Sequence, residues 1–362
     1  MSAGASASTP SPDAPAAGRP RLTAVRFDGQ ALFALDQTVL PWEERELALR
    51  SAGEVAAAIK RLAIRGAPLI GVAAAYGVAL ELAREPTPEA LERAADTLVR
   101  ARPTAVNLAW AVERVRAAVR AAPADAPPDA LAAAAAREAR AIHAAEEAAS
   151  DAMAVHGADL LAGTRRLLTH CNTGALAAPG RGTALGVVVE LAARGELDHV
   201  LVTESRPLLQ GARLTSYELH RLGIEHTLIV DSAAAGLLAR GEAQAVIVGC
   251  DRVAANGDVA NKVGTYPLAL AARAADLPFV VAGPTSTIDP GCPGGAQIVI
   301  EERDGEEVRT AGGRPLALPQ TRARNPAFDV TPAALVHALV TERGAAAPVN
   351  RDTVAALLRA RA

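Results

Sequence analysis

The chain has 362 residues, a length that suggests two domains. Half of the residues are hydrophobic but only 2% are aromatic, so a core must be filled by Leu, Val, Ile and Ala. The formal net charge of −3 implies no basic surface for nucleic acid or anionic lipid, and any anionic ligand must be held by a few placed cations. No uninterrupted apolar run reaches the roughly 18 residues that a membrane span needs. We therefore predict neither a nucleic-acid nor a membrane partner.

Three cysteines, Cys171, Cys250 and Cys292, lie far apart, and no CxxC pair is present. This pattern favours neither a zinc site nor a disulfide framework, and it suits a reducing cytoplasm. Residues 1–20 are mostly Ala, Ser, Pro and Gly without an apolar segment. We expect them to form a disordered tail and not a secretory signal.

Residues 21–150 are predicted to form a small, mainly helical domain. Short apolar alternations and turn residues between Leu22 and Leu49 indicate a small antiparallel sheet. Five helical patterns follow, at 52–64, 70–83, 88–101, 107–121 and 128–157. The second is apolar on nearly all faces, as in a buried helix, and the long fifth is expected to bridge two domains.

Residues 151–362 have a different pattern, in which short apolar runs alternate with longer segments. Apolar runs of strand length occur at 166–170, 199–203, 226–230, 245–248 and 278–282. Segments of helix length separate them, at 182–193, 208–222, 233–240 and 265–274. Strands that alternate with helices predict an α/β fold, with a Rossmann-like, doubly wound parallel sheet in this second domain.

Polar residues follow four of these strands, and the carboxyl ends of strands line the ligand crevice of such a sheet. Cys171 is a candidate base, with nearby backbone N–H groups favouring its thiolate; the alternative is a small buried hydrophobe. Asp251 is a candidate acid, because desolvation at an apolar strand end favours a protonated carboxyl. Its alternatives are a helix cap or a salt bridge with Arg252.

Several cations are candidates for holding an anion. Lys262 follows Asn261 and precedes a helix that begins near Thr265, whose free N–H groups would point at the ligand. The alternative is a capped helix with a solvated lysine. Arg65 and Arg102 stand at breaks between helices, where they either reach across an interdomain crevice or end a helix in solvent.

The run 180–186 matches G-x-G-x-x-x-G, close to a dinucleotide-binding fingerprint, and Glu204 ends the next strand. The fingerprint should follow its strand directly, but eight residues, 172–179, lie between. We therefore disfavour a nicotinamide-dependent dehydrogenase.

Seven separated motifs resemble methylthioribose-1-phosphate isomerases, a family grouped with the alpha, beta and delta subunits of eukaryotic initiation factor 2B. They lie at 65–71, 102–108, 169–174, 204–215, 251–264, 284–289 and 325–332. The resemblance implies an aldose–ketose isomerase of methionine salvage that converts 5-methylthioribose 1-phosphate to 5-methylthioribulose 1-phosphate. It also implies action without metal or nucleotide cofactor, and a homodimer.

By these motifs, Cys171 and Asp251 would be the catalytic pair. The substrate would be held by Arg65, Gly66, Ala67, Arg102, Gln210, Asn261 and Lys262. Asp251 would protonate the ring oxygen, and Cys171 would assist hydrogen transfer from C2 to C1, through a cis-enolate or a hydride shift. The chain departs from the family pattern at Cys250, Ser205 and Pro267.

Two further readings stay open. One is an isomerase of another 1-phosphorylated pentose, such as 5-deoxyribose 1-phosphate or ribose 1,5-bisphosphate. The other is a non-catalytic regulatory protein like the initiation-factor subunits.

Overall fold

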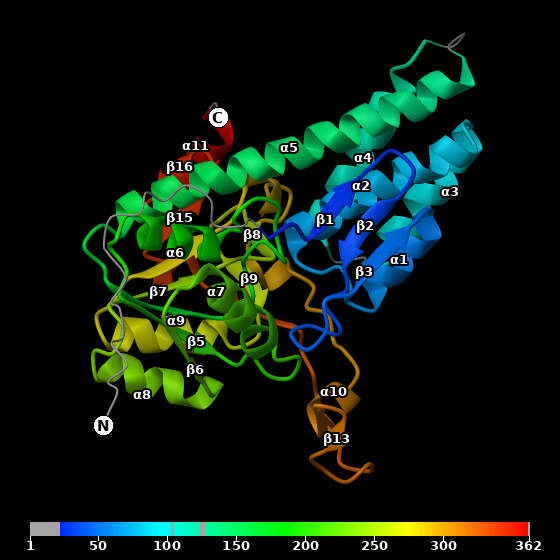
Figure 1. Ribbon diagram of the computed structural model, residues 1–362. Helices are drawn as coiled ribbons and strands as arrows, with labels where there is room; N and C mark the ends of the chain where they lie inside the picture. The colour runs from blue at the N-terminus through cyan, green and yellow to red at the C-terminus, as the bar shows by residue number, and fades with distance from the viewer. Residues whose placement is uncertain (1–21, 103–104, 124–126, 361–362) are drawn as a thin grey trace, which may run out of the picture.

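The structure is a computed structural model that describes residues 22–102, 105–123 and 127–360. The predicted tail at 1–20 and the motif residues Pro103 and Thr104 lie outside the described residues. Figure 1 shows a helical part with a small sheet on one side, a larger sheet on the other, and one long helix running across both. The predicted α/β architecture is confirmed.

The helical part contains the predicted antiparallel sheet, in the order β1-β2-β3. Its strands and the helices packed with them are β1 (Val25–Phe27), β2 (Leu32–Leu35), β3 (Glu46–Leu49), α1 (Ala52–Lys60), α2 (Ala67–Arg84), α3 (Pro88–Val99) and α4 (Val106–Arg120). By length and composition α2 is able to cross a membrane, but 83% of it is buried inside the protein. It is the core helix that its all-round apolar pattern predicts.

The larger sheet has seven strands in the order β16-β15-β10-β7-β4-β5-β6. They are β4 (Arg166–Thr169), β5 (His199–Thr203), β6 (His226–Ile229), β7 (Ala245–Val248), β10 (Phe279–Ala282), β15 (Ala338–Thr341) and β16 (Gly344–Ala346). All neighbours are parallel except β15 and β16. The first five strands were predicted within a residue or two, whereas β15 and β16 were not.

Helices of this part are α6 (Ala184–Ala193), α7 (Ser216–Leu222), α8 (Ala234–Ala239), α9 (Thr265–Ala274) and α11 (Arg351–Arg359). A π-helical turn at Gly211–Thr215 leads into α7. The chain lays β5 and β6 on one side of β4, and β7, β10 and β15 on the other. The centre of the sheet, between β4 and β7, is therefore a topological switch point, where open α/β sheets place their ligands.

Residues 251–264, which connect β7 to the helix predicted at 265–274, do not form a simple turn. They form a hairpin, β8 (Arg252–Ala254) and β9 (Val259–Lys262), which joins β11 (Ile288–Asp289) and β14 (Phe328–Thr331) in a four-stranded sheet. Between β11 and β14 the chain forms an arm, residues 290–327, with α10 (Glu306–Arg309), β12 (Thr310–Ala311) and β13 (Arg314–Pro315). Part of the arm projects from the body, drawn orange in Figure 1.

The long helix α5 (Pro128–Leu160) belongs to both parts. Ala135, Ala139 and Ile142 pack into the core of the helical part, whereas Met153 and Ala158 pack into the core under the large sheet. This agrees with the expected bridging helix. The domain boundary placed at residue 150 stays a prediction, and it falls inside this helix.

The contact between α5 and α6 generates a stability prediction. A Cβ on Gly157 would overlap the methyl groups of Val187, so we expect Gly157→Ala to lower the free energy of unfolding by about 1–3 kcal/mol. The control is Gly236→Ala in α8, where the nearest atom is the Arg240 Nη1 at 3.8 Å. There we expect no loss, or a gain of up to ~1 kcal/mol from helix propensity. Urea denaturation measures both, and equal effects would contradict this packing.

Candidate functional site

One cavity lies at the carboxyl ends of β4 and β7, and every predicted site residue lines it. These are Arg65, Gly66, Ala67, Arg102, Cys171, Gln210, Asp251, Asn261 and Lys262. Its empty space, including the part that is open to solvent, is about 770 Å³. Residues far apart in the sequence are thus brought together, and both the helical part and the sheet part contribute side chains to the cavity.

Cys171 follows β4 in a left-handed backbone conformation, with φ of 63°. This conformation is uncommon for a residue other than glycine. Two hydrogen bonds hold it: the Cys171 N–H donates to Ser205 Oγ (2.8 Å), and its carbonyl accepts from Thr215 Oγ1 (2.6 Å). Ser205, one of the departures from the family pattern, therefore fixes the turn that presents the thiol.

Asp251 follows β7 and begins the β8–β9 hairpin, where its N–H donates to the Ala260 carbonyl (2.9 Å). Burial raises the pKa of its carboxyl above the ordinary value, against the opposing effect of Arg102, Arg65 and Lys262. This direction agrees with the expected acid. Asp251 is not a helix cap, because it lies in a hairpin well before α9 begins.

The thiol of Cys171 is also affected by burial. Its pKa is raised, and the negative charge of Asp251 raises it further, whereas Arg65 and Lys262 lower it. The backbone N–H of Asn172 lowers the pKa of the thiol, as expected of the backbone N–H groups beside it, but the net shift is upward. Desolvation outweighs the hydrogen bond from the Asn172 backbone.

Arg65 connects the helical part to the residue beside the thiol. Its Nη1 and Nη2 donate to Asn172 Oδ1 (2.6 Å) and to the Asn172 carbonyl (2.8 Å). Asn172 Nδ2 in turn donates to the buried carboxylate of Glu218 (2.8 Å), which sequence reasoning did not single out. The next residue, Gly66, has φ of 98°, and a Cβ there would overlap the Ala177 backbone.

Lys262 reaches the cavity from β9 and is 95% buried, so the solvated alternative is wrong. Burial lowers the pKa of its ammonium, whereas Cys171 and Asp251 act in the opposite direction. The predicted anion site at the start of α9 is also wrong. There the Asp329 carboxylate accepts from the N–H groups of Gly264 (2.7 Å) and Tyr266 (3.0 Å). Lys262 thus supplies a positive charge to the cavity, but the N–H groups at the start of α9 are already bonded to Asp329.

Gln210 lines the cavity just before the π-helical turn. Its buried Oε1 has no hydrogen-bond partner among the residues that the structure describes. The flanking arginines hold backbone segments that are distant in the sequence. Arg206 donates to the carbonyl groups of Val308 (2.9 Å) and Thr310 (3.0 Å), and Arg213 to those of Gln37 (2.6 Å) and Leu40 (2.9 Å).

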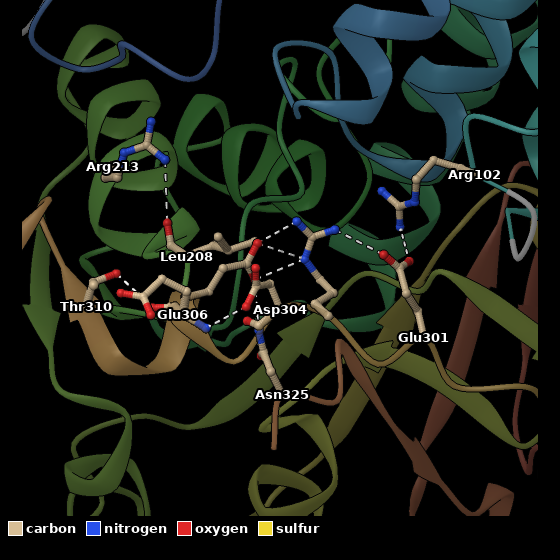
Figure 2. A network of polar contacts seen from close by, with 10 residues as sticks. Arg102, Leu208, Arg213, Glu301, Asp304, Glu306, Thr310 and Asn325 are labelled. Carbon is tan, nitrogen blue, oxygen red and sulfur yellow. Dashed lines mark hydrogen bonds and ion pairs between the residues drawn. The ribbon is translucent and has the colours of Figure 1, made fainter. Parts of the chain in front are cut away.

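Arg303 also lines the cavity, although no sequence motif selected it. It stands in a run of charged residues on the arm, a pattern that usually marks a solvated surface. Arg303 and Arg102 both donate to the carboxylate of Glu301, which also belongs to the arm. Figure 2 shows Glu301 beside Arg102, with Asn325 in the same network. Only pairings with residues far along the chain reveal that this segment reaches the site.

The glycines at 180–186 have structural roles. A Cβ on Gly182 would overlap the backbone of Thr173 and Gly174, so this glycine permits close packing beside the cavity. Within the described ranges, no cluster of three or more His, Cys, Asp or Glu side chains is arranged to hold a metal ion.

Comparisons with known proteins agree with the motifs. A model of the initiation factor 2 subunit family matches residues 63–348. A methylthioribose-1-phosphate isomerase of Anaeromyxobacter dehalogenans is 54% identical over 90% of this chain and 94% of its own length. A 5-deoxyribose 1-phosphate isomerase of Moorella thermoacetica is 50% identical over 91% and 95%.

Two solved structures are also similar. The 5-methylthioribose 1-phosphate isomerase of Pyrococcus horikoshii OT3 has a TM-score of 0.86 and 39% identity, covering 94% of this chain and 97% of its own. The delta subunit of translation initiation factor 2B from A. fulgidus has a TM-score of 0.80 and 39% identity, covering 92% and 99%. The chain therefore belongs to the initiation factor 2 subunit family, within the group that includes the methylthioribose-1-phosphate isomerases, as its motifs predicted.

Proposed function

We propose that this protein is an aldose–ketose isomerase that converts 5-methylthioribose 1-phosphate to 5-methylthioribulose 1-phosphate. The supporting observation is one cavity that holds a thiol and a carboxyl from adjacent strand ends, Cys171 and Asp251, with several cations around them. The names and high identity of the relatives support the same activity.

The substrate explains why an acid is needed. Its anomeric oxygen carries the phosphate, so the ring cannot open as the ring of a free sugar does. Asp251 donates a proton to the ring oxygen as the bond from that oxygen to C1 breaks. Burial raises the pKa of this carboxyl, which favours the protonated form that the step requires.

After ring opening, the hydrogen on C2 moves to C1 and the C2 hydroxyl becomes a carbonyl. In the enolate route, Cys171 takes the hydrogen from C2 as a proton and returns a proton to C1. In the hydride route, the hydrogen moves with its electron pair, and only the hydroxyl proton needs a base. Protonation of Asp251 removes a charge that raises the pKa of Cys171, so an acid at Asp251 favours a base at Cys171.

The cations suit the phosphate. Arg65, Arg102 and Lys262 line the cavity, and charge-assisted hydrogen bonds from these groups would fix C1 and C2 against the catalytic pair. Gly66 and Ala67 lie at the start of α2, the positive end of an 18-residue helix. Gln210 and Asn261 offer amides for the sugar hydroxyls.

The 5-substituent decides between close alternatives. Leu62, Leu208 and Phe328 add apolar surface to the cavity, which supports a methylthio group. The relative named for 5-deoxyribose 1-phosphate makes the deoxy sugar the second candidate. A bisphosphate would require further cations at the far end of the sugar.

We also propose a homodimer located in the cytoplasm, without a cofactor. The isomerisation is redox-neutral overall and needs no external electron acceptor. Leu228 in the edge strand β6 and Val230 just after it are about half exposed, which supports association of two copies there. All three cysteines are free, which suits a reducing compartment.

The catalytic pair is tested by turnover without added metal, followed by proton NMR in heavy water. We expect Cys171→Ala and Asp251→Asn each to lose at least about 10²–10⁴-fold in kcat/KM, because each removes a proton-transfer group. Cys292→Ala, outside the cavity, should keep its activity. Retained activity in either cavity variant would refute the pair. Solvent deuterium in the product would favour the enolate route.

Electrostatic coupling between the two groups can be tested without substrate. The charge of Asp251 raises the pKa of Cys171, so Asp251→Asn should lower that pKa and increase alkylation of Cys171 by iodoacetamide at pH 8. Mass spectrometry measures the rate. Asp276→Asn, before β10 and therefore at the opposite edge of the sheet, is the control. An unchanged or slower rate in Asp251→Asn would contradict the coupling.

Substrate preference is tested by steady-state rates on three sugars. We expect kcat/KM to be highest for 5-methylthioribose 1-phosphate, then 5-deoxyribose 1-phosphate, then ribose 1,5-bisphosphate, because Leu62, Leu208 and Phe328 add apolar surface to the cavity. A preference for the bisphosphate would overturn the assignment of the methylthio substrate but not the isomerase chemistry.

A further inference from the structure

Glu301 joins two arginines that line the cavity. Its Oε2 accepts from Arg102 Nη2 (2.9 Å), and its Oε1 accepts from Arg303 Nη1 (3.0 Å) (Figure 2). Arg102 comes from the helical part and Arg303 from the arm, so one carboxylate links the two parts at the edge of the site. The Arg102 and Glu301 side chains are only 15% and 21% exposed, so solvent screens this pair less than it screens a surface pair.

The backbone around Glu301 is itself fixed. The Glu301 carbonyl accepts from the N–H of Ala327, which lines the cavity (2.8 Å), and the Arg303 N–H donates to the Asn325 carbonyl (2.9 Å). Glu302 forms a bridge with Pro326 between these bonds. The base of the arm is therefore a short paired segment, which gives Glu301 a defined position.

Arg303 is held from a second side. Its Nε lies 3.1 and 3.0 Å from the two oxygens of Glu307, which also accepts from Asn325 Nδ2 (2.8 Å). Burial of a charged guanidinium is tolerated when acids and amides satisfy it in this way. Asn325, Glu307 and Glu301 thus orient one guanidinium at the wall of the cavity.

Glu301 lies behind these guanidiniums and not in front of them. Arg102 and Arg303 line the cavity, whereas Glu301 does not. Within the described part of the chain, the buried Nε of Arg102 has no hydrogen-bond partner. A buried donor without a partner is costly, and an acceptor on a bound ligand would satisfy it.

We propose that Glu301 is a positioning residue, which holds Arg102 and Arg303 as a pair toward the anionic group of the substrate. Arg303 is accordingly a further substrate-binding residue. The inference rests on the proposed function for the identity of the anion, a phosphate ester. The arm therefore contributes to the site through this carboxylate. In this proposal the ligand is held jointly by the helical part, the sheet part and the arm.

The test is Glu301→Gln, which keeps the size of the side chain but replaces one accepting oxygen with an NH₂ group that repels a guanidinium. We expect affinity for inorganic phosphate, measured by calorimetry, to fall about three- to tenfold. With the sugar phosphate, KM should rise by a similar factor while kcat changes little, as for a loss of uniform binding. Removal of a negative charge alone would act in the opposite direction and tighten phosphate binding.

Glu306→Gln is the matched control. This glutamate on the same arm pairs with Arg309 (3.0 Å) and does not line the cavity, so the phosphate affinity and KM of the variant should equal those of the wild type. In an Arg102→Ala background, Glu301→Gln should lose most of its effect, because the two residues act together. Thermal denaturation shows whether each variant is folded.

Three results would overturn the proposal. They are tighter phosphate binding in Glu301→Gln, unchanged affinity in a folded variant, and full additivity with Arg102→Ala. If the wild type binds phosphate and shows the expected differences but does not convert the sugar, the proposed function fails while the positioning role stands. If the wild type converts the sugar normally but Glu301→Gln has an unchanged KM, the positioning role fails while the proposed function stands.

Discussion

The site depends on the parallel pairing of β4 with β7 at the centre of the large sheet. The register places Thr169 opposite Ile247, so both strands end at the same level. The turn after β4 presents Cys171, and the start of the hairpin after β7 presents Asp251. Because neighbouring strands lie only about 4.8 Å apart, this pairing brings two groups from distant parts of the sequence to one cavity.

Burial and charge work against each other in this cavity. Desolvation raises the pKa of both Cys171 and Asp251, whereas Arg65 and Lys262 favour the charged form of each. A buried, positively charged crevice suits a phosphate ester, and it keeps the two proton-transfer groups sensitive to one another. The helical part is needed for this balance, since Arg65 reaches across to Asn172 beside the thiol.

Sequence reasoning predicted the parts that follow regular patterns. Apolar runs and helical periodicity located five strands of the large sheet, the helices and the strand-end residues, and the motifs selected residues that all line one cavity. It failed where the structure depends on distant partners. Asp329 in β14 accepts hydrogen bonds from the N–H groups at the start of α9. The arm places Arg303 at the cavity through contacts with Glu301 and Asn325. The polarity of neighbouring residues in the sequence does not indicate such long-range pairings.

A structure of the protein with the sugar phosphate bound tests the central claim most directly. The account predicts C1 and C2 between the Cys171 sulfur and the Asp251 carboxyl, with the ring oxygen of the substrate about 2.6–3.2 Å from that carboxyl. It also predicts the phosphate against Arg65, Arg102 and Lys262. A complex with the sugar outside this cavity, or with Cys171 and Asp251 both on one face of the sugar and away from C1 and C2, would contradict the account.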